Sequence, residues 1–311
     1  MKRQSPKLVV GKKTFDNSNP FFIAEIGNNH LGKFDLCRKM IDEAKMAGAN
    51  AVKLQKRNNK KLFTKKKFNE TYNSENSFGK TYGIHREKLE FDKKKYIELK
   101  KYSESLGLIF FATPFDIDSA DFLHHEIKIP LFKLASSDLN NFLLIKRILS
   151  YKKPMILSTG FSSIKDVTRT YKYIEKKTIN FSLLQCTASY PCKTEDLNLN
   201  VITTFKKKFS KILVGLSSHH NGIAMENIAY LLGARVFEKH FTTDRSMKGT
   251  DQSFSLVGTG LKKMIRDIKR ISIAMGSKTK KPLECEKIPM KKMAKSIVFA
   301  RNVKKGEKLS L

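Results

Sequence analysis

A chain of 311 residues is long enough for one large α/β barrel with a short appendage, or for two ordinary domains. No run approaches the roughly 20 apolar residues that a membrane helix needs, so we predict no membrane association. The four cysteines are irregularly spaced and form no CxxC pair, which argues against a disulfide framework. The basic N-terminus lacks the apolar core of a secretory signal, and we expect a cytoplasmic protein.

The formal net charge is +32, from 61 Lys and Arg against 29 Asp and Glu. Such an excess can attract polyanions or steer anionic substrates. The basic residues are spread along the chain and concentrated on helix-like stretches such as Lys93–Lys101, which favours a solvated, lysine-rich surface. We therefore predict no nucleic-acid partner, while steering of a phosphorylated substrate is compatible with this surface.

The predicted elements begin with a short hairpin over residues 7–19, which would close the bottom of the fold. From Phe21 onward, apolar runs typical of strands alternate with amphipathic stretches that have the helical period. The predicted strands are Phe21–Gly27, Ala51–Gln55, Leu108–Thr113, Phe132–Ser136, Pro154–Thr159, Phe181–Thr187, Ile212–Ser217 and Val236–Phe241.

Amphipathic segments between these strands predict helices, for example at Phe34–Ala47 and Ile164–Ile174, with a last one at Leu261–Met275. Candidate helix caps precede several of them: Asp116, Asp118, Ser162 and Ser163. Eight strand–helix units of this length predict a (β/α)8 TIM barrel, whose active sites lie at the carboxyl ends of the strands. A doubly wound open sheet is the alternative fold.

Two segments fall outside the repeat. Residues 57–92 are too long and polar for a simple connection, and we expect a substrate-covering loop, with partial disorder as the alternative. After Gly276 the pattern changes, and we predict a barrel domain over residues 1–280 followed by a linker and a second small domain over residues 281–311. Its last part predicts a strand and a Lys-Gly-Glu turn, a segment too short to bury a core of its own.

Polar residues close three of the predicted strands. Glu25 lies at the end of the first, and His219 and His240 follow the last two. Imidazole suits a divalent metal, and a carboxylate can orient substrate, so a metal-assisted active site at this rim is one interpretation. The two histidines are 21 residues apart, a spacing that is not diagnostic, and structural roles are the alternative.

Two lysines, Lys53 and Lys133, also end apolar strands. A lysine inside a barrel is costly to bury unless it pairs with an anion, so both predict a phosphate or carboxylate site, with structural ion pairs as the alternative. Hydroxyl groups that could satisfy phosphate oxygens, or that belong simply to turns, are Ser136, Ser158 and Ser217. The other polar residues at this rim are Asn28, Asn29, His30, Gln55, Thr113, Asp138, Thr159, Tyr190 and Glu238.

The chain resembles the sialic acid synthase family, the N-acetylneuraminate synthases and their nonulosonate relatives. The resemblance runs in order from about residue 5 to residue 311, through FFIAEIGNNHLGKFDLCRKMIDEAKMAGANAVKLQ, TYGIHREKLEF, FFATPFDIDSADFL, FKLASSDLNNFLLI, KPMILSTGFSS, LLQCTASYP, VGLSSHHNGIA and FEKHFTTDRSMKGTDQSFSL. It implies a TIM barrel followed by an antifreeze-like (SAF) domain, here incomplete, and a domain-swapped homodimer.

The resemblance also implies a reaction. Family members condense phosphoenolpyruvate with the open-chain aldehyde of an N-acetylmannosamine-type sugar and release phosphate by C–O cleavage, with Mn²⁺ or Mg²⁺ as cofactor. By this resemblance His219 and His240 are the metal ligands. The residues that would hold phosphoenolpyruvate are Lys53, Lys133, Ser136, Ser158 and Ser217, and those that would face the sugar and the reacting carbonyl are Glu25, Gln55, Tyr190 and Asp251.

Departures from the family pattern leave the acceptor open. Ala188 stands where bacterial sialate synthases have Asn, which leaves room for a 6-phosphorylated or di-N-acetylated sugar. TYGIHREKLEF and MKGTDQSFSL are closer to the animal-type branch, which uses the 6-phosphate. The alternatives are a legionaminate, pseudaminate or KDO-type synthase and, from another class, a non-catalytic polyanion-binding protein. We also expect a weakened sugar site, because the sequence stops before the arginine that family members donate across the dimer.

Overall fold

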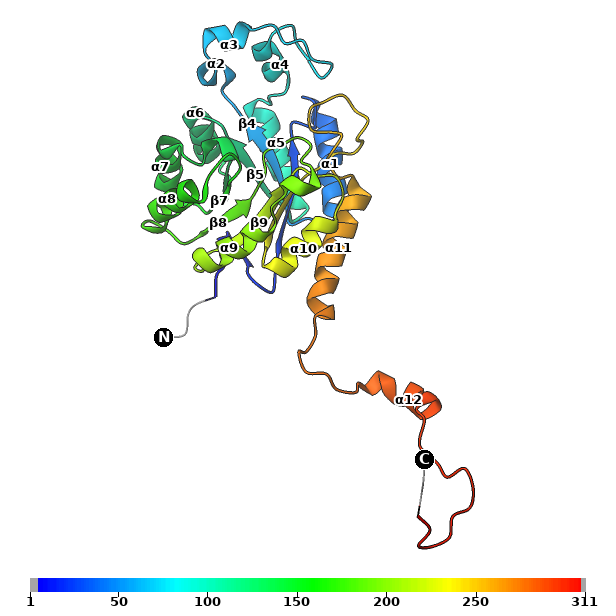
Figure 1. The fold of residues 1–311 in the computed structure, drawn as a ribbon. Helices are drawn as coiled ribbons and strands as arrows, with labels where there is room; N and C mark the ends of the chain where they lie inside the picture. The colour runs from blue at the N-terminus through cyan, green and yellow to red at the C-terminus, as the bar shows by residue number, and fades with distance from the viewer. Residues whose placement is uncertain (1–4, 309–311) are drawn as a thin grey trace. The chain divides into compact units, whose positions relative to one another are not determined.

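The computed structural model describes residues 5–308 of the chain. These residues divide into two units, the first ending at Ser272 and the second beginning at Ile273. The first unit contains a closed barrel of eight parallel strands surrounded by helices (Figure 1). This confirms the predicted (β/α)8 barrel and excludes the open sheet.

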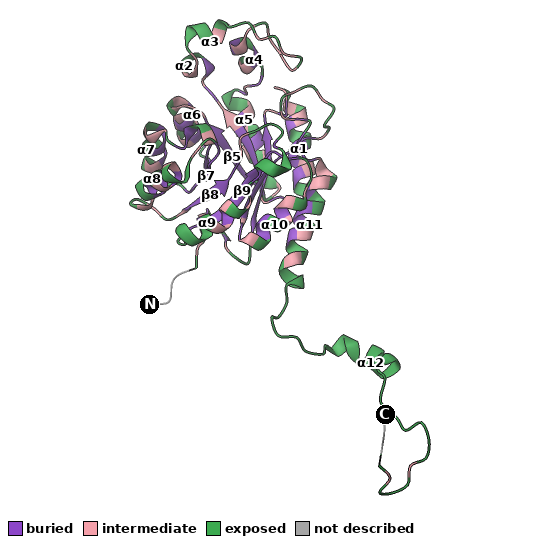
Figure 2. Ribbon diagram, in the orientation of Figure 1, coloured by how far each residue is buried: buried purple, intermediate pink, exposed green. Residues whose placement is uncertain are grey.

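Each barrel strand pairs with the next along the chain, and the last strand closes the ring against the first. The strands are β3 (Phe21–Gly27), β4 (Ala51–Lys56), β5 (Ile109–Pro114), β6 (Phe132–Leu134), β7 (Met155–Ser158), β8 (Phe181–Gln185), β9 (Leu213–Ser218) and β10 (Val236–His240). All eight predicted strands are confirmed. They are buried almost throughout (Figure 2), because helices cover them outside and side chains fill the barrel inside, which explains their continuous apolar runs.

Helices follow the strands around the outside of the barrel. They are α1 (Phe34–Ala47), α5 (Lys93–Ser105), α6 (Ile117–Asp121) with a π-helical turn over Phe122–Glu126, α7 (Phe142–Ser150), α8 (Ile164–Glu175), α9 (Asn200–Lys208), α10 (Ala224–Leu232) and α11 (Gly258–Ala274). Of the candidate caps, Asp116 accepts a hydrogen bond from the Ser119 amide of α6, and Ser163 forms a capping box with Asp166 of α8.

The predicted hairpin is confirmed as β1 (Leu8–Val10) paired antiparallel with β2 (Lys13–Phe15). The Phe15 ring stacks on Phe21, at the beginning of β3, with 4.1 Å between centroids. The Asn180 side chain, just before β8, both accepts from and donates to the backbone of Val9. The hairpin thus packs against the amino ends of the strands, opposite the rim that carries the site.

The insertion over residues 57–92 is structured. It contains three short helices, α2 (Asn59–Leu62), α3 (Lys65–Asn69) and α4 (Tyr82–Lys88). Thr64 and Thr81 cap α3 and α4 through their hydroxyl groups. The segment reaches the loop after β10, where the Gly249 amide donates to Asn76 Oδ1 at 2.9 Å. The structure thus gives this segment regular elements of its own, and its role as a substrate-covering loop stays a prediction.

The second unit contains a 3-10 turn over Glu284–Glu286 and the helix α12 (Lys287–Met293). The strand predicted near its end is wrong: described residues 294–308 form no strand. Ile297, Val298 and Phe299 are exposed there, and a strand needs a partner edge that these residues lack. The predicted turn is confirmed, since the Glu307 amide donates to the Lys304 carbonyl at 3.1 Å. The incomplete antifreeze-like domain stays a prediction.

Candidate active site

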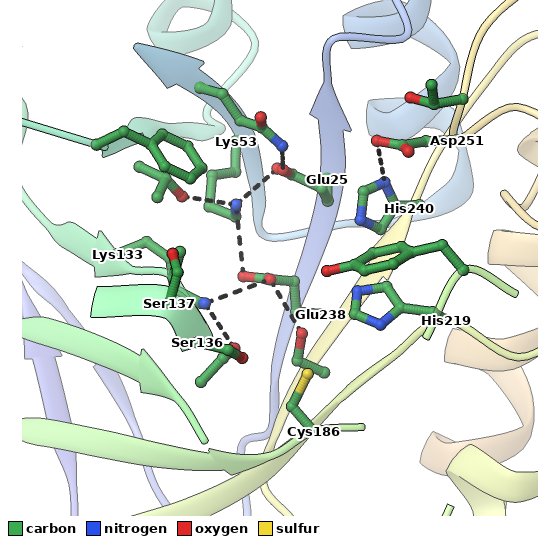
Figure 3. Close-up of a pocket in the computed structure, with 18 of the residues that line it drawn as sticks. Glu25, Lys53, Lys133, Ser136, Ser137, Cys186, His219, Glu238, His240 and Asp251 are labelled. Carbon is green, nitrogen blue, oxygen red and sulfur yellow. Dashed lines mark hydrogen bonds and ion pairs between the residues drawn. The ribbon is translucent and has the colours of Figure 1, made fainter. Parts of the chain in front are cut away.

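A cavity of about 520 Å³ opens at the carboxyl ends of the barrel strands. Figure 3 shows its charged side chains converging from separate strands. Eleven of the twelve predicted site residues line it: Glu25, Lys53, Gln55, Lys133, Ser136, Ser158, Tyr190, Ser217, His219, His240 and Asp251. A volume of this order is typical of small-molecule sites.

Strand register explains why these residues meet. Glu25 on β3 pairs laterally with Lys53 on β4 and with His240 on β10. On the other side of β10, Glu238 pairs laterally with Ser217 on β9. Parallel strands in register bring residues at the same height into contact, so residues more than 200 positions apart share one wall of the cavity.

The Lys53 ammonium lies between two buried carboxylates. Its Nζ is 2.8 Å from Glu25 Oε2 and 3.8 Å from Glu238 Oε2. It also donates to Thr113 Oγ1 at 2.9 Å. Lys53 is only 3% exposed, and such a buried cation is tolerated because the two carboxylates compensate the lost hydration.

Lys133 is the second buried lysine of the cavity and lies on β6, with β5 between it and the strand of Lys53. Its Nζ donates to Ser158 Oγ at 2.6 Å and to the Leu134 carbonyl at 3.0 Å, and it lies 3.6 Å from Glu238 Oε1. Desolvation lowers the pKa of Lys133, although Glu238 opposes the shift. Two ammonium groups with hydroxyl donors beside them form a cationic pole that fits a phosphate group.

Glu238 holds this pole together, and the sequence interpretation gave it no role. Ser217 Oγ donates to its Oε1 at 3.2 Å, and both lysines approach the same carboxylate. Burial acts to raise its pKa, but the attraction of Lys133 and Lys53 outweighs that effect and the pKa of Glu238 is lowered. Its place in the sequence, two residues before His240 in a strand, was the signal that its side chain faces the same cavity.

The two histidines lie side by side, with 5.3 Å between ring centroids. His219 Nδ1 is 3.0 Å from the Thr187 carbonyl. This contact orients the ring so that Nε2, its other nitrogen, points away from the carbonyl. Burial, and next His240, lowers the pKa of His219 to about 3, so this imidazole is neutral at physiological pH. Asp251 Oδ2 lies 3.6 Å from His240 Nδ1.

This pair fits a divalent metal in its donor chemistry. Neutral imidazole is the form that binds metal, and a second contact to a backbone carbonyl, as at His219, is typical of histidine ligands. His240 Nδ1 is buried and has no hydrogen-bond partner among the described residues. Within residues 5–308, no group of three or more His, Cys, Asp and Glu side chains is arranged to hold an ion. A metal on His219 and His240 would therefore leave coordination positions open, as in catalytic rather than structural sites.

Two aromatic rings lie beside the histidines. The ring of Tyr190 lies 4.2 Å from that of His219, and Phe254 packs edge-on against both imidazoles. Burial raises the pKa of Tyr190, which keeps its hydroxyl protonated as a hydrogen-bond donor. Near them Gln55 Nε2 donates to Glu25 Oε1 at 2.9 Å, which fixes the carboxylate toward the cavity.

Comparison with known proteins identifies the family. A model of the NeuB family matches residues 40–280. The chain is 39% identical over 291 residues to the "N-acetylneuraminate-9-phosphate synthase" of Homo sapiens, covering 94% of this chain and 81% of the human protein. The chain belongs to the NeuB family.

Other relatives of this NeuB chain differ in the sugar acid that their names give. It is 35% identical over 289 residues to the "N,N'-diacetyllegionaminic acid synthase" of Campylobacter jejuni, covering 92% of this chain and 86% of that protein. A crystal structure of the sialic acid synthetase from Leptospira borgpetersenii has a TM-score of 0.79 and 32% identity, covering 94% and 98% of the two chains. These names confirm the predicted enzyme and its family, and they argue against a non-catalytic polyanion-binding protein.

One predicted residue is not part of this NeuB cavity. Asp138 does not belong to its lining. Its carboxylate accepts from Asn141 Nδ2 at 2.9 Å and from Ser137 Oγ at 3.2 Å, and desolvation raises its pKa. Asn141 caps α7, so Asp138 stabilises the turn that leads into this helix. Its substrate-binding role stays a prediction, and the contacts that the structure gives its carboxylate are those of the turn.

Membrane association was predicted to be absent. Across the described part of the NeuB chain, none of the helices combines the length and apolar character that crossing a bilayer requires.

Gly160, which follows Ser158 and Thr159, offers a test of the cationic pole formed by Lys53, Lys133 and the hydroxyl groups beside them. The Gly160 amide donates to Ser136 Oγ at 3.0 Å, and a Cβ at this position would come within 2.8 Å of the same oxygen and 2.9 Å of Ala188 Cβ. Gly160→Ala should therefore displace the Ser136 hydroxyl and raise the KM for phosphoenolpyruvate by about tenfold, in steady-state kinetics. Gly258→Ala is the matched control, because its Cβ would meet nothing closer than 3.5 Å. An unchanged KM in Gly160→Ala would show that Ser136 does not contact the ligand.

Proposed function

We propose that this chain condenses phosphoenolpyruvate with the open-chain aldehyde of an N-acetylmannosamine-type sugar, producing a nonulosonic acid and inorganic phosphate. The observation that carries the proposal is the shared cavity, in which two buried ammonium groups and two imidazoles lie on either side of Glu238 (Figure 3). The ammonium groups suit the enol phosphate, and the imidazoles suit a cation beside the sugar carbonyl.

His219 and His240 would hold the metal, Mn²⁺ or Mg²⁺. When bound, such an ion supplies Lewis-acid polarisation of the aldehyde. The carbonyl of Thr187 orients the His219 ring for that role, and the Asp251 carboxylate lies 3.6 Å from His240 Nδ1.

The chain's own groups would act on the phosphoenolpyruvate. Lys53 and Lys133 bind its phosphate and stabilise the charge that grows as the C–O bond breaks. Bond formation between C3 and the aldehyde carbon leaves C2 electron-poor, and a water molecule adds there. The Glu25 carboxylate, held by Lys53 and Gln55, is placed to accept the proton from this water, while the aldehyde oxygen takes up a proton to become a hydroxyl.

Phosphate release measured over a panel of aldehydes tests the proposal. The panel contains N-acetylmannosamine, its 6-phosphate, a 2,4-diacetamido sugar and arabinose 5-phosphate, each with phosphoenolpyruvate labelled with ¹⁸O in its bridging oxygen. We expect release with an amino sugar and transfer of the label into phosphate. Turnover with arabinose 5-phosphate alone would instead indicate a KDO-type synthase, and unlabelled phosphate would contradict C–O cleavage.

The names of the relatives leave the acceptor's phosphate open. The human relative is named for a 9-phosphate product, and the Campylobacter relative is named for an unphosphorylated sugar acid. The homodimer, the antifreeze-like domain and the cytoplasmic location stay predictions from the sequence.

A further inference from the structure

Two arginines lie in the same cavity, outside the group of residues that the reaction uses. Arg57 follows β4 directly, and Arg86 comes from α4 of the insertion. Neither guanidinium has a carboxylate within 4.0 Å among residues 5–308. Glu90, whose charge acts on Arg57 from a greater distance, forms its ion pair with Lys56 at 2.8 Å.

Both guanidinium groups are held in place by neutral partners. Arg57 stacks on the Phe115 ring, with 3.6 Å from its central carbon to the ring centroid, and donates to Gln55 Oε1 at 2.7 Å. Arg86 donates to the Tyr82 hydroxyl through Nε at 3.1 Å and through Nη2 at 3.0 Å. A guanidinium has five N–H groups, so these contacts fix the planes while leaving further donors on each side chain.

The burial of Arg57 is unusual for an unpaired cation. The residue is only 8% exposed. Desolvation, and next the charge of Arg86, lowers the pKa of Arg57 to about 10, while the charge of Glu90 acts in the opposite direction. Arg57 is still protonated at pH 7, and the two guanidinium groups repel each other. Two like charges placed together at low exposure are stabilised when an anion binds between them.

The distance between the reacting end of the cavity and the arginines suits the length of one acceptor molecule. Lys53, Gln55 and Arg57 alternate along β4 and its continuation, so they face the same side. At about 3.3 Å per residue, Lys53 and Arg57 are about 13 Å apart along the backbone. An extended six-carbon aldehyde with a terminal phosphate spans about 9 Å from C1 to phosphorus, from bond lengths near 1.5 Å. The Arg57 side chain shortens this separation, because its guanidinium reaches Gln55 Oε1 at 2.7 Å and Gln55 Nε2 donates to Glu25 at 2.9 Å. An acceptor of this length would therefore reach from Glu25 to the Arg57 guanidinium.

We propose that Arg57 and Arg86 form a second phosphate site, which binds the terminal phosphate of a 6-phosphorylated amino-sugar acceptor. The inference rests on the proposed function, because it takes the aldehyde to lie between the histidines and this second site. Guanidinium groups bind phosphate oxygens in bidentate fashion, and each such bond is strong where water is excluded. The cavity then has one cationic pole for each of the two phosphorylated substrates.

Arg86 is the residue to change, since Arg57 also holds Gln55 and through it Glu25. The measurement is the ratio of kcat/KM for N-acetylmannosamine 6-phosphate to that for N-acetylmannosamine. We expect the unaltered enzyme to prefer the phosphorylated sugar, and Arg86→Gln to lower the ratio by about tenfold to a hundredfold, with the KM for phosphoenolpyruvate kept. Arg86→Lys should keep most of the preference, because the charge remains.

Arg38→Gln is the matched control. Arg38 is exposed on α1, stacks on Tyr102 and is remote from the cavity lining, so its loss should not change the ratio. An unaltered enzyme without preference, or a ratio unchanged in Arg86→Gln, would overturn the inference. The inference would also be overturned if Arg86→Gln changed only the inhibition of the enzyme by inorganic phosphate. The arginines would then bind free phosphate and not the phosphate of the sugar. Absence of phosphate release with every amino sugar would instead refute the proposed function itself.

Discussion

Replacing His219 with alanine is expected to abolish tight binding of a divalent cation and to lower kcat/KM by about a thousandfold or more. The expectation rests on the 5.3 Å separation of the two imidazole centroids and on the neutral state of His219. Removing one of two protein ligands leaves a single imidazole, and changes even to residues that only support ligands commonly cost 10–100-fold in affinity. The measurement is isothermal titration with Mn²⁺ in the absence of substrates, followed by the phosphate-release assay.

The fold should survive this substitution. His219 carries no charge in the folded protein, so its loss leaves no buried ion without a partner. His125→Ala is the control, since His125 is exposed on the π-helical turn after α6 and lies outside the cavity. Equal Mn²⁺ affinity in His219→Ala and the unaltered protein would refute the proposed metal site, whatever the effect on activity.

Lys53→Met is expected to lower the free energy of unfolding by about 3–5 kcal/mol and to abolish measurable binding of phosphoenolpyruvate. Lys53 lies between the carboxylates of Glu25 and Glu238, and its loss leaves Glu25 buried with no cation beside it. Urea unfolding monitored by circular dichroism measures the first effect, and tryptophan cannot serve as probe because the chain has none. Titration calorimetry with phosphoenolpyruvate measures the second.

A second substitution separates stability from function. In the double variant with Lys53→Met and Glu25→Gln, the remaining pair of Lys133 and Glu238 stays balanced, so most of the stability should return. Phosphoenolpyruvate binding and activity should not return, because the cationic pole still lacks one of its two ammonium groups. A double variant that is as unstable as Lys53→Met would show that Lys53 contributes mainly by packing. A Lys53→Met protein with normal phosphoenolpyruvate affinity would remove this lysine from the site.

Much of the barrel follows from local pattern. Phe21–Gly27 is apolar except for Glu25 near its end, and Phe34–Ala47 repeats its apolar residues at the helical period, so each element follows from its own residues. The segment near Ile297 shows the limit of such reasoning. It has the composition of a strand, yet a strand forms only when another edge accepts its hydrogen bonds.

Site residues could be predicted from the sequence where a charged side chain stands at a position that is expected to be apolar. A lysine such as Lys53 or Lys133 inside an apolar strand is conspicuous, because burying its charge requires a partner. Glu238 and Arg57 were harder to recognise, since a carboxylate near a strand end or an arginine in a polar loop has many ordinary roles. Asp138 shows how a sequence position leaves a role undecided, because the contacts of its carboxylate in the structure are with the turn residues Ser137 and Asn141.

The sequence by itself determined the order of strands and helices, the end of the barrel that carries the polar residues and the family resemblance. Only the tertiary structure decided which side chains meet: that Glu238 lies between Lys53 and Lys133, and that Arg57 and Arg86 line one cavity with no carboxylate within 4.0 Å of either guanidinium among residues 5–308. The physical reason is that element formation depends on residues within a few positions of each other. Contacts across the barrel depend on strand register and closure, which couple residues as far apart as Glu25 and His240.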